Sequence, residues 1–62
     1  MDVTTILETK IDNLLKAIRK DLVEKRDAYS RFAGYTKALV DFNIITEETA
    51  KHYRKEFAKI LF

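Results

Sequence analysis

The chain has 62 residues, of which 47% are hydrophobic and 35% charged, with no cysteine, no proline and one glycine. This length allows one small domain, and the lack of cysteine excludes disulfide bonds, thiolate metal ligands and cysteine nucleophiles. Twelve Lys and Arg residues against ten Asp and Glu residues give a net charge of +2, too small to indicate nucleic-acid binding by itself. Because one copy of so short a chain has a small core, we expect it to gain stability from a partner.

The N-terminal residues lack the basic start and apolar core of a signal peptide. Thr5 and Glu8 match a capping box, so a helix is predicted to begin at Thr5, with Asp2 as an alternative cap. No window is long and apolar enough to cross a bilayer. We therefore predict a cytoplasmic protein and expect no membrane partner.

Residues 5–42 are predicted to form one long helix, because apolar side chains recur every three or four positions. Acidic residues stand four positions before basic ones on the polar face, as in Asp21 and Lys25, a spacing that supports a helix. At about 1.5 Å per residue this helix would be roughly 55 Å long. Gly34 is interpreted as a point where another helix approaches closely, with a kink or a ligand contact as alternatives.

A turn is predicted at residues 43–46, followed by a second helix over residues 47–61. Asn43 suits the left-handed position that ends a helix, and Ile44 could pack back on Leu39. Thr46 is the predicted N-cap of the second helix, whose first residues are acidic. Because the connection is short, we expect the two helices to be antiparallel neighbours.

The predicted architecture is therefore all-α, a single domain of residues 1–62 built as a hairpin of one long and one short helix. The short helix can cover only residues 28–42 of the long one, which leaves an apolar row without a partner in the chain. We predict that this row is a self-interface through which the hairpin forms a homodimer, giving a four-helix bundle. A different protein could fill the same groove. The row comprises Leu7, Ile11, Leu14, Leu15, Ile18 and Leu22.

The sequence shows no catalytic, cofactor-binding or metal-binding motif. Ser30 and His52 are the one serine and the one histidine, and nothing around Ser30 resembles a nucleophile elbow. His52 and Glu56 have the spacing of two metal ligands, but a third ligand is missing. With Gly34 as the sole glycine there is no phosphate-binding loop. We therefore expect a protein that is not an enzyme and has no cofactor.

A basic face is predicted on the second helix, formed by Lys51, Arg54, Lys55 and Lys59. Cations near a helix C-terminus complement its dipole and keep a protein soluble. The same face could contact nucleic acid or an acidic protein, and the apolar residues opposite it also allow a helix lying on a membrane surface. The sequence leaves these interpretations open.

Residues 29–41 follow a pattern in which Tyr29 and Phe32 precede Gly34-Tyr35, and Ala38-Leu39 come after. In this pattern the chain resembles small helical proteins of tailed bacteriophages that have no assigned activity. The resemblance implies an accessory protein of host takeover or of the virion, located in the host cytoplasm or in the virion. It carries over no functional residue.

Two functional hypotheses follow. The first is a small regulatory module that self-associates, binds a larger protein, and inhibits or bridges it. The alternative is a small dimeric nucleic-acid-binding regulator that uses the basic face of the second helix.

Overall fold

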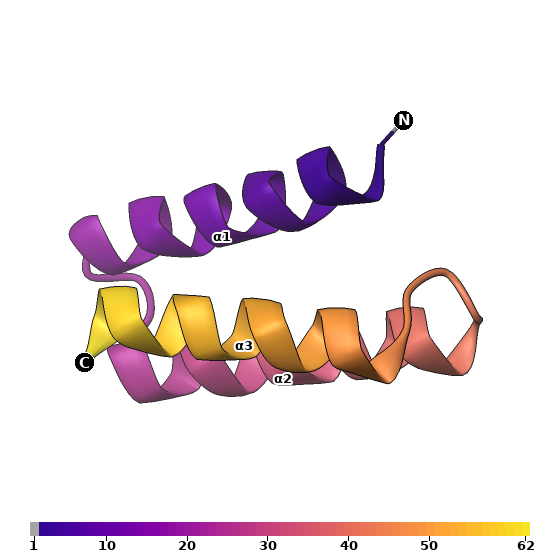
Figure 1. Cartoon of the computed structure of the whole chain (residues 1–62). Helices are drawn as coiled ribbons and strands as arrows, with labels where there is room; N and C mark the ends of the chain where they lie inside the picture. The colour runs from indigo at the N-terminus through magenta and orange to yellow at the C-terminus, as the bar shows by residue number, and fades with distance from the viewer. Residues whose placement is uncertain (1) are drawn as a thin grey trace.

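The computed structural model describes residues 2–62, and within them the chain forms three α-helices and no strand. These helices are α1 (Val3–Arg19), α2 (Lys25–Asp41) and α3 (Glu47–Leu61) (Figure 1). The all-α prediction is confirmed. The single helix predicted over residues 5–42 is wrong, because the chain turns at residues 20–24 and reverses its direction. The architecture is therefore a three-helix arrangement and not a two-helix hairpin.

Helix α1 begins earlier than the capping box at Thr5 predicted. The Oδ1 atom of Asp2 accepts a hydrogen bond from the backbone N–H of Thr4 at 3.2 Å. This bond satisfies one of the amides that have no partner inside the first helical turn. Asp2, the alternative cap, is thus the N-cap, and Thr5 lies inside the helix.

The first turn ends α1 without a glycine. Asp21 adopts a left-handed backbone conformation with φ of 58°. The N–H of Leu22 donates to the carbonyl of Ala17 at 2.9 Å, and the N–H of Asp21 donates to the carbonyl of Ile18 at 3.0 Å. These two bonds form a Schellman motif, which satisfies carbonyls at the end of a helix. Asp tolerates the left-handed conformation better than most residues, so the helix can end here.

The second turn repeats this arrangement. The predicted left-handed conformation of Asn43 and the predicted N-cap at Thr46 are both confirmed. Asn43 has φ of 60°, and the N–H of Ile44 donates to the carbonyl of Leu39 at 2.8 Å. Thr46 Oγ1 accepts from the N–H of Thr49 at 3.2 Å and caps α3. The two left-handed residues stand 22 positions apart (43 minus 21), as do the N-caps of α2 and α3 (46 minus 24).

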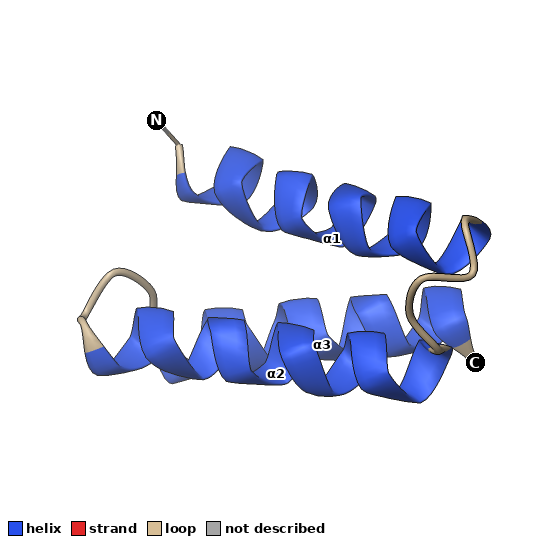
Figure 2. Ribbon diagram, turned by 180° about the vertical axis from the view of Figure 1, so that it is seen from behind, coloured by secondary structure: helices blue, strands red, loops and turns tan. Residues whose placement is uncertain are grey.

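Helices α2 and α3 lie side by side and antiparallel, and α1 runs along the pair, tilted relative to it and opposite in direction to α2 (Figures 1 and 2). The rings of Phe32 and Phe57 are 5.0 Å apart between centroids, and Tyr29 meets Phe62 edge-on at 6.3 Å. The predicted antiparallel pairing of the last two helices is therefore confirmed. Between α1 and α2, Lys10 Nζ lies 5.0 Å from the centroid of the Tyr35 ring, a cation–π geometry.

The core receives side chains from all three helices, and α1 contributes much of its apolar row. Thr36 is also buried, and its Oγ1 donates to the Ala33 carbonyl at 2.9 Å. Within residues 2–62 no buried side-chain nitrogen or oxygen lacks a hydrogen-bond partner. The buried hydrophobic cluster comprises Leu7, Ile11, Leu14, Ala28, Phe32, Phe57 and Leu61.

The self-interface was predicted because the apolar row was expected to have no partner within the chain, and this expectation is wrong. Three of its six residues, Leu7, Ile11 and Leu14, are buried inside the single chain, and Leu15 and Ile18 are partly buried against the same core. The turn at residues 20–24 makes this possible, because it lays the apolar stripe of α1 onto α2 and α3. No second copy is needed to cover the stripe, so the argument for a dimeric four-helix bundle no longer holds.

The interpretation of Gly34 as a close contact between helices is also wrong within this chain. Gly34 is exposed, and a Cβ atom placed there would meet nothing within 4 Å. Helix α2 continues through it from Lys25 to Asp41.

Candidate interaction surfaces

The residues considered for catalysis or metal binding do not come together. Ser30 and His52 are both exposed, on different helices. The His52 ring packs edge-on against Tyr53, with centroids 5.4 Å apart. In the described part of the chain, no three His, Cys, Asp or Glu residues are placed to hold a metal ion. None of the helices in residues 2–62 is long and apolar enough to span a membrane.

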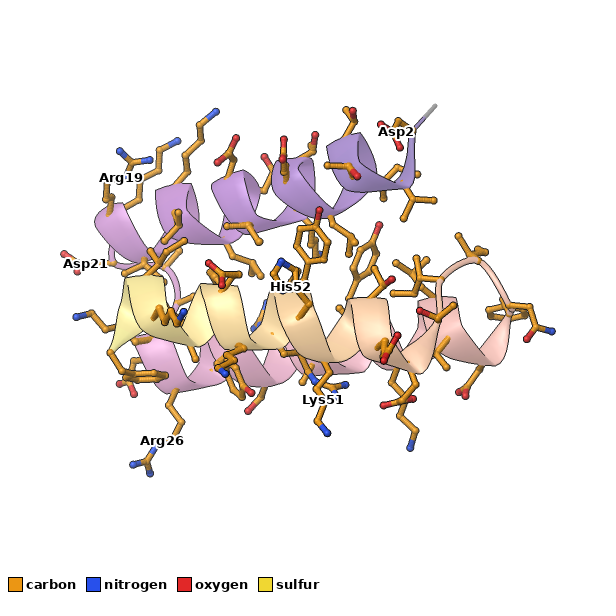
Figure 3. All side chains as sticks on the ribbon, in the orientation of Figure 1. Asp2, Arg19, Asp21, Arg26, Lys51 and His52 are labelled. Carbon is orange, nitrogen blue, oxygen red and sulfur yellow. The ribbon has the colours of Figure 1, made fainter. Side chains whose placement is uncertain are left out.

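The basic face of α3 is only partly available to a partner. Lys51 and Lys55 are exposed, and Lys51 points away from α1 (Figure 3). Arg54 is 3.5 Å from Glu47 and its side chain is only 24% exposed, while Lys59 Nζ lies 3.5 Å from Glu56 Oε1. These acidic residues of the same helix reduce the repulsion between the four cations. Such exposed pairs contribute at most about 1 kcal/mol.

Large apolar side chains are exposed at both ends of the bundle. The α1–α2 turn and the C-terminus lie at one end, which we call the C-end, and the N-terminus and the α2–α3 turn lie at the other, the N-end (Figures 1 and 2). The C-end patch consists of Leu22, Ile60 and Phe62, which are 74%, 57% and 76% exposed. The N-end patch consists of Phe42 and Ile44, at 77% and 49%.

The exposures of Leu22 and Ile44 do not follow from the periodicity of the helices. Leu22 and Ile44 each follow a left-handed residue, and the Schellman motif places them just beyond a helix end. Beside Leu22 the surface has a shallow, open depression lined by the turn and by Ile18 of α1. Of the six residues predicted as a self-interface, Leu22 alone is largely exposed.

Charge divides between the same two ends. We split each helix at its central residue, Ile11, Ala33 or Arg54. The half that contains the C-end then carries eight Lys or Arg against five Asp or Glu residues, a side-chain charge of +3. The half that contains the N-end carries three against five, a charge of −2, with the central Arg54 counted in neither half. Free chain termini would lower each magnitude by one and leave both signs unchanged.

The cations closest in sequence to Leu22 are not neutralised by neighbours. Arg19 and Lys20 precede the turn, and Lys25 and Arg26 follow it. Within residues 2–62 none of these four forms an ion pair. Figure 3 places Arg19 and Arg26 at the C-end and Asp2 at the opposite end. Asp21 and Glu24 lie among these cations, so residues 19–26 carry four basic against two acidic side chains and the rim of the C-end patch is basic on balance.

No known protein family, curated protein or solved structure matches the chain. The surfaces described above are consequently the basis for a functional assignment.

Proposed function

We propose that this chain is a non-enzymatic protein-interaction module that self-associates and binds, and thereby inhibits or bridges, a larger protein. One observation carries the proposal. Five large apolar side chains are exposed, and they are gathered at two opposite ends of the bundle. Apolar surface that is left in water beside charged residues is typical of protein-binding sites.

These side chains lie largely outside the core, although the Phe62 ring meets the edge of Tyr29. Leu22 and Phe62 are about three-quarters exposed, whereas the buried cluster already receives residues from all three helices. Keeping such side chains in water forgoes the stabilisation of about 1.5–3 kcal/mol that burying each would give. A partner that covers a patch would recover part of this free energy. Two separate patches would let one copy contact two proteins, which supports a bridging role.

The test is capture on the immobilised protein, with variants at each end. We expect the wild-type chain to retain a larger protein. The C-end variant, which combines Leu22→Ser with Phe62→Ser, or the Phe42→Ser variant of the N-end should fail to retain it. The matched control, Thr9→Ser, changes an exposed position on α1 and should retain the same protein. The retained protein, once purified, should bind with a 1:1 or 2:1 stoichiometry in a calorimetric titration.

Two results would argue against this function. Retention that is equal for all the variants would show that the patches are not the binding sites. Retained material that a nuclease removes, and that is lost when Lys51 and Lys55 become glutamine, would support the nucleic-acid-binding regulator instead.

A further inference from the structure

We propose that one occupant of each patch is a second copy of this chain, and that the copies associate head to tail, with the C-end of one against the N-end of the next. The inference rests on the proposed function, because it names a partner for the same patches. It differs from the two-fold dimer that the sequence predicted, in which identical surfaces would face each other.

The positions of the two patches allow a head-to-tail contact. The molecule measures 33 × 21 × 16 Å along its principal axes, and the two patches lie at opposite ends of the helices (Figure 1). One copy can therefore contact another at each end without steric conflict between its two neighbours. Each contact would bury Leu22, Ile60 and Phe62 of one copy against Phe42 and Ile44 of the next.

The net charges of the two halves also favour a head-to-tail contact. A head-to-tail contact brings the half with a side-chain charge of +3 against the half with −2, whereas two C-ends would meet with +3 on both sides. Like charges across an interface oppose association and opposite charges favour it. The Debye length is about 10 Å at 0.1 M salt, so charges of touching ends interact while those at the far ends of one copy are screened from each other. Electrostatics therefore favours unlike ends.

Exposed charged side chains lie around each patch. The C-end patch is next to Lys20 and Lys25, which are exposed and form no ion pair in the described residues. The N-end patch is next to Asp41 and Glu48, which are exposed and equally without an ion pair within residues 2–62. Asp21 and Glu24 also border the C-end patch, but residues 19–26 carry four basic against two acidic side chains, so this border is positive on balance while the border at Asp41 and Glu48 is negative.

The experiment is to measure solution mass by light scattering and sedimentation over a range of protein concentrations. The C-end variant combines Leu22→Ser with Phe62→Ser, and the N-end variant combines Phe42→Ser with Ile44→Ser. We expect the wild-type mass to rise with concentration beyond that of a dimer, and each variant alone to stay at the 7.3 kDa of one copy. An equimolar mixture of the two variants should form a dimer and nothing larger, because each retains one intact and complementary end.

A charge variant tests the same contact without altering the apolar patches. Lys20→Glu combined with Lys25→Glu changes two exposed residues, and circular dichroism should show unchanged helicity. We expect this variant to stay monomeric at concentrations where the wild type associates. Association of the wild type should weaken on the order of tenfold when salt rises from about 0.05 M to about 0.5 M.

Several outcomes would overturn the proposal. They are a wild-type mass of one copy at millimolar concentration, dimerisation of either end variant alone, and association that the charge variant leaves unchanged. Binding to anionic vesicles through the C-end without any rise in solution mass would also overturn it, in favour of a lipid surface. If the chain stays monomeric yet captures a larger protein through Phe62, this inference fails together with the self-association in the proposed function, while the binding of a larger protein stands.

Discussion

Replacing Leu7 by alanine should remove much of the stability of this chain. Leu7 is in the N-terminal half of α1 and has no exposed surface, because it packs in the core shared with α2 and α3. Leu→Ala substitutions at buried sites cost about 2–5 kcal/mol. A chain of this length has an unfolding free energy of about 3–9 kcal/mol at roughly 0.05–0.15 kcal/mol per residue. We therefore expect Leu7→Ala to lose about 2–5 kcal/mol, which is about half of the total at the middle of both ranges.

The midpoint of urea unfolding is measured with circular dichroism as the signal, at two protein concentrations tenfold apart. High salt is used because it screens the charges between the ends of neighbouring copies. With a urea m-value of about 1 kcal/mol/M for a small protein, the midpoint should fall by about 2 M or more, or the variant should be unfolded without urea. Leu22→Ala is the matched control, since Leu22 is 74% exposed. Its unfolding free energy should stay within about 0.5 kcal/mol of the wild type.

The same experiment separates this fold from a dimer held by α1. If Leu7 packs within its own chain, the wild-type midpoint is the same at both concentrations. The reasoning is refuted if Leu7→Ala unfolds like the wild type, or if the wild type loses helicity on dilution. Unchanged unfolding of Leu7→Ala would show that Leu7 is not buried, and loss of helicity on dilution would show that a second copy covers the row on α1.

Three further substitutions test local features, each by the free energy of unfolding in urea. Gly34→Ala should stabilise the protein by about 1 kcal/mol, because the added methyl group meets nothing within 4 Å and alanine favours a helix; a loss would mean that this face is covered. Asp21→Gly should be neutral or stabilise by up to about 1 kcal/mol, because φ is 58° there, whereas the control Asp12→Gly, at an exposed position within α1, should cost about 0.3 kcal/mol. A larger loss of stability for Asp21→Gly than for Asp12→Gly would contradict the left-handed conformation at Asp21. Thr46→Ala should cost about 1 kcal/mol through the lost N-cap bond, and Thr9→Ala, an exposed position within α1, should cost nothing.

The second half of the fold could be predicted from sequence because its signals are local and agree with one another. Asn43 tolerates the left-handed conformation, Thr46 can cap a helix, and acidic residues follow it. All three point to the same turn, and the antiparallel pairing of α2 and α3 follows from its short length.

The first turn could not be recognised in the same way, because its residues also suit a helix. Asp21 and Lys25 have the spacing of a stabilising pair inside a helix, and neither glycine nor proline marks the break. The available signal was the similarity of two segments 22 positions apart. Asp21-Leu22-Val23-Glu24 and Asn43-Ile44-Ile45-Thr46 each place an Asx residue before two aliphatic residues and a polar residue that precedes the next helix.

The error at the first turn carried over to the candidate site. A continuous helix leaves Leu7, Ile11 and Leu14 uncovered, and a second copy is then the simplest way to bury them. The chain buries them itself by breaking the helix, and the Schellman bonds at Asp21 and Leu22 limit the loss of backbone hydrogen bonding. The exposed ends could not be predicted from periodicity, because they depend on where each helix stops.

The short connections also determine how the chain reaches its fold. Five residues link α1 to α2 and another five link α2 to α3, and each helix packs against its neighbour in sequence. Contacts of this kind require only short loops to close, so little chain entropy is lost before they form. Helical domains with such local contacts fold in microseconds to milliseconds. Since the chain has no proline, no slow isomerisation phase should follow, and refolding after dilution from urea should be a single fast step.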